Sequence, residues 1–130
     1  MRYMMLIYSR EGDSTAEADK ALAQQHHAVM DEARRRGIFQ GAEPLQPTGT
    51  AVTVRRSRKG EALVTDGPFA ETKEQLAGYY ILDCVNITEA LEWARKIPTG
   101  CLGQEGCIEV RPIRPMTIIQ DGIAESPTLY

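Results

Sequence analysis

Two segments of the chain have the pattern of β-strands that are apolar on both faces. Successive side chains of a strand point to opposite sides of a sheet. In Arg2–Ser9 one side would carry Tyr3, Met5 and Ile7, and the other Met4, Leu6 and Tyr8. Leu76–Cys84 repeats the pattern, with Tyr79 and Ile81 on one side and Tyr80, Leu82 and Cys84 on the other. Because both faces of such strands have to be covered, these segments predict a sheet that lies between two layers.

A long helix is predicted after the first strand. Ser14 and Glu17 form a capping-box pattern, in which each side chain accepts a hydrogen bond from the backbone N–H of the other residue. Helical spacing of apolar residues continues to about Arg36, and the apolar stripe consists of Ala18, Leu22, Val29 and Ala33. Gly37 is the expected C-terminal cap of this helix.

A second helix is predicted after the second apolar strand. Asn86 and Glu89 repeat the capping pattern, and Pro98 would end the helix because proline lacks the backbone N–H that a helix needs. The apolar stripe of this helix would consist of Ile87, Ala90, Leu91, Ala94 and Ile97.

Shorter strands complete the pattern. Phe39–Leu45 and Cys107–Ile113 are expected to form single strands, and Ala51–Arg56 and Glu61–Thr65 are expected to form a hairpin. The resulting order is β-α-β, hairpin, β-α-β. It predicts an α+β fold, namely a ferredoxin-like split βαβ unit with an inserted hairpin.

In that fold both helices cover the same face of the sheet, so the opposite face would be bare in a monomer. Leaving several large apolar side chains in water forgoes roughly 1.5–3 kcal/mol for each of them. We therefore expect a symmetric homodimer that packs sheet to sheet. The alternative interpretation is that the C-terminal tail folds back over the open face.

Composition and motifs exclude several classes of protein. The chain has 130 residues and a net charge of -3, which fits one domain and argues against a general nucleic-acid binder. Its three cysteines include no C-x-x-C pair, and no G-x-G-x-x-G, P-loop or G-x-S-x-G motif is present, so we expect no metal and no cofactor. We find no secretory signal pattern and no apolar run long enough for a membrane span, so we expect a cytoplasmic protein that does not contact membranes.

His26 and Asp66 are the residues that could move protons. His26 lies at the edge of the apolar stripe of the first helix, and an imidazole suits proton transfer near neutral pH. Asp66 follows a predicted strand and precedes a Gly-Pro turn, where a carboxylate could orient a histidine. Two structural interpretations stay open, since Asp66 could instead fix the turn and His26 could be a satisfied, half-buried histidine. His27 points about 100° away from His26 and is expected in water, so the pair does not form a zinc site.

The segment from Asp66 to Tyr80, with the sequence DGPFAETKEQLAGYY, resembles the signature of the DGPF branch of the YCII-related family. Three further segments, 2–8, 41–47 and 108–113, are similar to other parts of that family. The resemblance covers most of a domain at 1–115 and leaves a C-terminal tail at 116–130. It implies a dimeric α+β barrel with a His–Asp pair in a pocket, and hence catalytic roles for His26 and Asp66. The wider family includes an enzyme that eliminates chloride from a hydroxylated ring, and some members of the branch are linked to alternative sigma factors.

Two functions follow as hypotheses. The first is a cofactor-independent lyase or isomerase that acts on a small molecule, with His26 moving a proton and Asp66 orienting His26. Tyr8, Phe69 and Tyr79 are the residues that we expect to contact its substrate. The second is a non-catalytic ligand-binding or regulatory module.

Overall fold

The computed structural model describes residues 1–12, 14–100, 106–116, 119–120 and 123–124. The fold is α+β and contains a mostly antiparallel sheet and two α-helices in this part of the chain. The elements follow one another as β1 (Arg2–Ser9), α1 (Ala16–Arg35), β2 (Phe39–Pro44), a 3-10 turn (Thr48–Thr50), β3 (Val52–Arg56), β4 (Ala62–Asp66), β5 (Gln75–Asp83), α2 (Ile87–Ala94), β6 (Gly106–Pro112), β7 (Ile119–Gln120) and β8 (Ile123–Ala124).

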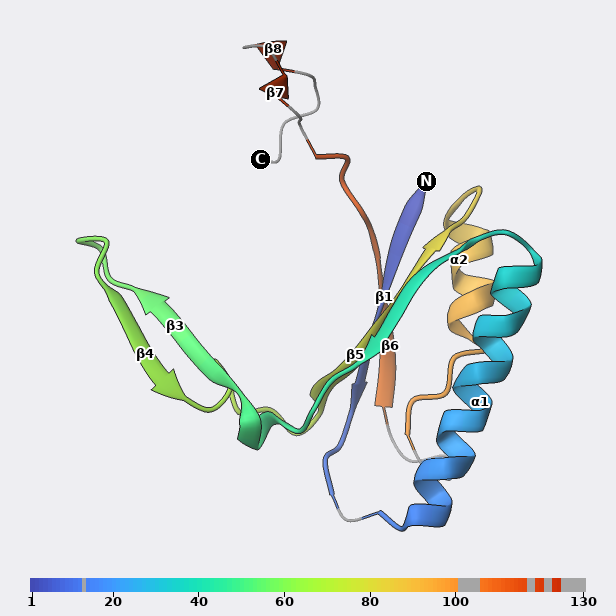
Figure 1. The fold of residues 1–130 in the computed structure, drawn as a ribbon, viewed down its shortest axis with the longest axis horizontal. Coiled ribbons are helices and arrows are strands. Elements are labelled where there is room, and N and C mark those ends of the chain that lie inside the picture. Colours follow the sequence, from blue (N-terminus) through green and yellow to red (C-terminus); the bar gives the residue numbers. More distant parts are fainter. Residues whose placement is uncertain (13, 101–105, 117–118, 121–122, 125–130) are drawn as a thin grey trace.

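The main sheet has the strand order β2-β5-β1-β6, and each neighbouring pair is antiparallel. Both helices cover one face of this sheet (Figure 1). The predicted order of strands and helices over residues 2–112 is confirmed, and the boundaries of the strands and of α1 shift by one residue or two. Helix α2 ends at Ala94, three residues before the predicted end at Ile97. The described residues of the C-terminal tail include the short antiparallel pair β7 and β8.

The hydrophobic core lies between the helices and the sheet. The side chains of β1 and β5 that point toward the helices are buried, namely Tyr3, Met5, Ile7, Tyr80 and Leu82. The helices contribute Val29 and Ala33 from α1, and Ala90 and Trp93 from α2. Met4, Leu6, Tyr79 and Ile81 point to the opposite face of the sheet and are only half-buried. The helices therefore cover only one of the two apolar faces of β1 and β5.

The N-terminus of α1 differs from the prediction. Thr15, not Ser14, is the N-cap, and its hydroxyl accepts a hydrogen bond of 3.0 Å from the backbone N–H of Ala18. The hydroxyl of Ser14 donates to a carboxylate oxygen of Asp19 instead. Helix α1 therefore begins one residue later than the capping-box pattern indicates. At its other end, Gly37 follows the cap with a φ of 73°, as predicted.

The buried stripe of α2 is rotated from the predicted one. Asn86 is the N-cap and accepts from the backbone N–H of Glu89, which confirms the predicted start. However, Ile87 and Leu91 are exposed, while Trp93 is 3% exposed and packs with Ala90 against the sheet. The stripe is rotated because the indole, the largest side chain of this short helix, occupies the core.

The β3–β4 hairpin leaves the main sheet on the face opposite the helices and extends away from it (Figure 1). Paired residues of adjacent strands share a face, and one face of this hairpin carries the apolar residues Val52, Val54, Ala62 and Val64, with Asp66 at one end and Arg56 at the other. All four of these side chains are exposed in the single chain. The hairpin thus presents an apolar face that its own chain leaves uncovered.

Gly78 allows β2 and β5 to approach closely. A Cβ atom at this position would lie 2.7 Å from the backbone oxygen of Glu43 on β2. On the other side of β5, the pairing with β1 shifts register between Ile7 and Tyr8. Any larger side chain at Gly78 would force the two strands apart at the end of the sheet where a cavity opens.

Candidate functional site

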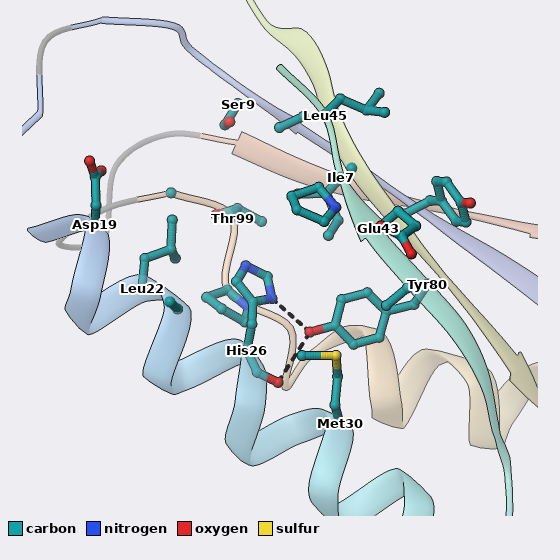
Figure 2. A pocket seen from close by; sticks show the side chains of 18 of the residues that line it. Ile7, Ser9, Asp19, Leu22, His26, Met30, Glu43, Leu45, Tyr80 and Thr99 are labelled. Carbon is teal, nitrogen blue, oxygen red and sulfur yellow. Dashed lines mark hydrogen bonds between the residues drawn. The ribbon is translucent and has the colours of Figure 1, made fainter. Parts of the chain in front are cut away.

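A cavity of about 710 Å³ lies between α1 and the adjoining ends of β1, β2 and β5 (Figure 2). Most of its wall is apolar and includes Ile7, Leu22, Met30, Ala42, Pro44 and Leu45. The polar groups of the wall include Ser9, Asp19, His26, Glu43, Tyr80 and Thr99. An apolar cavity of this size with a few convergent polar groups is typical of small-molecule sites.

His26 and Tyr80 form the polar centre of this cavity. Nδ1 of His26 lies 2.7 Å from the hydroxyl oxygen of Tyr80, which is hydrogen-bonding distance. The same hydroxyl has a longer contact of 3.4 Å with the backbone carbonyl of His26. Figure 2 shows that Nε2, the other ring nitrogen of His26, faces away from Tyr80, toward the side chains of Thr99 and Ile7. Tyr80 therefore fixes the imidazole ring and leaves Nε2 toward the cavity.

Burial keeps both groups of this pair uncharged at neutral pH. Desolvation lowers the pKa of His26 below its ordinary value of 6.5, and the charge of the neighbouring His27 lowers this pKa further. Desolvation also raises the pKa of Tyr80 to about 12. A neutral imidazole has one N–H donor and one acceptor nitrogen, and the bond to Tyr80 decides which of them faces the cavity.

The structure brings some of the predicted site residues together and not others. His26 lines the cavity, and Tyr79 also lies in its wall, but the side chain of Tyr79 points to the sheet face opposite the helices. Asp66, the predicted partner of His26, is the last residue of β4, where its exposed carboxylate has no hydrogen bond or ion pair within the described part of the chain. Phe69 is 76% exposed beyond the hairpin, and Tyr8 lies on the face of β1 that points away from the helices. Within one protomer the position beside Nδ1 of His26 is occupied by Tyr80.

Comparison with known proteins places these residues in a family. A model of the YCII-related domain matches residues 1–117. The chain belongs to the YCII-related family. A protein of Rhizobium meliloti (strain 1021) that is described as uncharacterised is 40% identical over 116 residues, which cover 87% of this chain and 92% of the relative. The YCII-related match covers the strands of the main sheet, both helices and the whole cavity wall.

In this YCII-related chain, sequence reasoning did not select Tyr80 as a site residue. A signal for it was present in the alternation of the strand. Tyr80 falls on the same side of β5 as Leu82 and Cys84, which is the side that the helices cover. A tyrosine hydroxyl that is buried in such a layer needs a hydrogen-bond partner, and polar residues on the covering helix are the candidates.

Other chemistry finds little support among the described residues. No group of three or more His, Cys, Asp or Glu side chains there could hold a metal ion. Burial raises the pKa of the Cys84 thiol to about 11, and it also raises the pKa of Cys107, so neither is an activated nucleophile. The third cysteine, at position 101, lies outside the described residues. Neither described helix has the length and apolar character of a membrane span.

Proposed function

We propose that this protein is a cofactor-independent enzyme of the lyase or isomerase type, in which His26 moves a proton on a small molecule held in the cavity. One observation carries the proposal: His26 is tethered to Tyr80 at 2.7 Å in the wall of a cavity of about 710 Å³, with Nε2 turned away from Tyr80 (Figure 2). A base has to be in the right orientation as well as at the right pKa, and this hydrogen bond provides the orientation.

The pair can present two forms of Nε2 to a ligand. When Nδ1 carries the proton, it donates to the oxygen of Tyr80, and Nε2 is an acceptor that can remove a proton from carbon. After this transfer both ring nitrogens carry protons, Nδ1 still donates to the oxygen of Tyr80, and Nε2 can return its proton to carbon, which restores the neutral ring. Elimination and isomerisation both need proton removal, and isomerisation also needs proton return, so one histidine with a reversible partner serves either reaction.

Proton exchange on carbon acids tests this proposal directly. We expect the protein to accelerate deuterium incorporation next to the carbonyl of uncharged ketones such as 2-tetralone in D2O, as followed by proton NMR. His26→Ala should reduce the acceleration by about 100-fold, because general base catalysis typically contributes 10²–10⁴-fold. Gln25→Ala is the matched control, since Gln25 is the exposed neighbour of His26 on the same helix and lies outside the cavity wall.

The outcomes separate the two hypotheses for this site. Acceleration that persists unchanged in His26→Ala would contradict the enzyme. Binding of the ketones without exchange would favour a ligand-binding or regulatory module, the second candidate function. That candidate is supported by the place of Asp66, because the His–Asp pair expected of a catalytic site is not assembled within one protomer. Similar domains are linked to alternative sigma factors, so a regulatory module would report its ligand to transcription.

Assignment to the DGPF branch is part of the proposal. It is supported by the segment from Asp66 to Tyr80, which combines the hairpin end with most of β5. In that branch the suspected partner of the histidine is an aspartate, so the assignment of Asp66 also depends on this resemblance. Tyr8 and Phe69 stay candidate ligand contacts on the same basis.

We also propose that the protein is a homodimer of ferredoxin-like protomers that pack as a dimeric α+β barrel. The strand order β2-β5-β1-β6 supports the ferredoxin-like protomer. The dimer is supported by the sheet face opposite the helices, which carries Met4, Leu6 and Ile81 and has no helix over it (Figure 1). A second copy of the same face would cover these side chains symmetrically.

A further inference from the structure

The β3–β4 hairpin forms a two-stranded sheet that is separate from the main sheet. A hairpin of two strands is marginally stable in water at best, unless a third strand or another layer packs against it. This hairpin extends away from the main sheet on the side that the helices leave uncovered, so neither helix packs on it (Figure 1). Its stability therefore depends on a cover other than the two helices.

The two faces of the hairpin differ in how their own chain covers them. One face carries Thr53, Arg55, Leu63 and Thr65. The hydroxyl of Thr53 donates to the carbonyl of Gly67 over 2.7 Å. The guanidinium of Arg55 donates to the carbonyl of Phe69 over the same distance. The segment that follows β4 is therefore held against this face. The opposite face, which we call the valine face, is the open one, since its residues Val52, Val54 and Val64 are 60%, 60% and 66% exposed.

Opposite charges flank the valine face. Asp66 is paired with Val52 near the base of the hairpin, and Arg56 is paired with Ala62 near its turn. Arg56 donates to the carbonyl of Gly60 over 3.2 Å, and a guanidinium has further N–H groups to offer. The face thus runs from a carboxylate through valines to a guanidinium, which gives it a direction.

A second copy of the valine face matches this pattern in one orientation. When two such faces stack antiparallel about a two-fold axis, apolar residues meet apolar residues, and the Asp66 end of each copy lies over the Arg56 end of the other. A parallel stack would place like charges together at both ends, which is unfavourable. The arrangement of charges therefore favours an antiparallel pair of hairpins.

We propose that the valine faces of two protomers pack against each other antiparallel about a two-fold axis, and that Asp66 of each protomer pairs with Arg56 of the partner subunit. The hairpin leaves the main sheet on the side of the sheet face that we propose to dimerise, so a single partner serves both surfaces (Figure 1). This inference rests on the homodimer that is part of the proposed function, and it does not depend on the chemistry of His26.

Cross-linking at two adjacent positions tests the contact. In the antiparallel pair Val64 lies over Val64 of the partner subunit, whereas Leu63, which is 56% exposed, points to the outside of the stack. Val64→Cys and Leu63→Cys are each made in the full-length protein with serine in place of the cysteines at positions 101 and 107, since the remaining Cys84 is buried. A short bismaleimide should give covalent dimers of Val64→Cys and at least about tenfold fewer of Leu63→Cys, because the outer faces of two stacked sheets lie beyond its reach.

Charge reversal tests the ends of the valine face. Arg56→Glu would place a carboxylate beside Asp66 of the partner subunit, and Asp66→Lys would place two cations together. Each single substitution should raise the Kd of the dimer at least about fivefold at low salt, because the two-fold axis repeats the contact. The double substitution restores opposite charges and should return Kd to within about twofold of the wild type. Sedimentation equilibrium measures Kd for the wild type and the three variants.

Each result supports the pairing of hairpins or overturns it. Cross-links in Val64→Cys alone, together with rescue in the double substitution, support it. Equal cross-linking at the two positions, or none in a Val64→Cys protein that has the mass of two chains, overturns the pairing and leaves the sheet-to-sheet homodimer in place. Single charge reversals that leave Kd unchanged overturn the antiparallel arrangement. A wild-type protein with the mass of one chain refutes the homodimer and this inference together, while proton exchange by His26 is measured independently.

Discussion

His26 combines two properties that rarely occur together on a helix surface, since it is partly desolvated and yet faces a cavity. Its Nδ1 has a partner in Tyr80, so the ring keeps one orientation without a charged neighbour holding it. Tyr80 is 3% exposed, and its hydroxyl would be an unsatisfied buried donor without His26. Each residue thus gives the other a hydrogen-bond partner. Without it, a buried polar group costs of order 1–3 kcal/mol.

The pH dependence of His26 is the first prediction at this scale. Because desolvation and His27 lower its pKa, the ring signals of His26 should titrate with a midpoint below 6.5 in an NMR titration. His27→Ala should raise this midpoint, since one of the two causes is removed, and should leave it below 6.5, since desolvation remains. A midpoint at or above 6.5 in the wild type would show that the imidazole is not desolvated.

The same shift has a consequence for stability. The unfolded chain takes up a proton at His26 near pH 6.5, whereas the folded protein resists it until a lower pH. The contribution of His26 to the free energy of unfolding is therefore present above pH 6.5 and falls as the pH drops below that value.

Half of this pair could be predicted from the sequence. The helical stripe of α1 placed His26 beside the core and His27 in water, because helix geometry fixes relative directions within one element. His26 pairs with Tyr80, which lies 54 positions further along the chain. The predicted pairing was with Asp66, on another element. Periodicity does not determine how such distant elements are placed relative to one another. Sequence patterns predicted the buried face of α1 but not the relative placement of the elements that meet it.

At the scale of single elements, the caps of the helices are the clearest example of local chemistry. Asn86 was identified correctly because asparagine three residues before glutamate has no competing cap beside it. At α1 two hydroxyl residues are adjacent, and the structure uses Thr15 while Ser14 bonds to Asp19. Local patterns thus located both helix starts to within one residue. The choice of cap was wrong only at α1, where two adjacent hydroxyl residues compete.

Paired substitutions at this helix start form the second prediction. Thr15→Ala should lower the free energy of unfolding by about 1 kcal/mol, because the N–H of Ala18 loses its acceptor. Ser14→Ala should change it by less than about 0.5 kcal/mol, since that hydroxyl serves an exposed side chain. Urea unfolding at one fixed protein concentration measures both. The reverse order of effects would mean that Ser14 is the functional cap in solution.

For the whole molecule, the order of elements over residues 2–112 was predictable because each strand and helix carried its own periodicity. The direction taken by the β3–β4 hairpin was not predictable. Its residues alternate as a strand pair in isolation, and nothing in that alternation says to which side of the main sheet the pair extends. The structure adds this direction, which places the hairpin on the side of the main sheet that the helices leave uncovered (Figure 1).

The proposed homodimer gives the third prediction. Light scattering coupled to size exclusion should give twice the mass of one chain. Ile81→Glu should reduce the mass to that of one chain, because a carboxylate in the middle of a packed sheet face would be buried without a partner.

Val85→Glu is the control for Ile81→Glu, since Val85 is 81% exposed outside the strands of the sheet and should leave the dimer intact. Circular dichroism verifies that each variant is folded. If Ile81→Glu fails to fold, Val64→Glu on the exposed hairpin is the second variant, and it should weaken the dimer without affecting the sheet. A wild-type protein with the mass of one chain would refute the dimer.

The position of β1 in the sheet also determines when the protein can fold during synthesis. β1 is made before the other strands of the main sheet, yet it lies at the centre of that sheet, where it pairs with β5 on one side and β6 on the other. Its edge toward β5 therefore stays unpaired until Gln75–Asp83 is made, and its edge toward β6 until Gly106–Pro112 is made. Such long sequence separation between partners slows folding, so this chain should depend on chaperones most while β1 is outside the ribosome and β6 is still inside it.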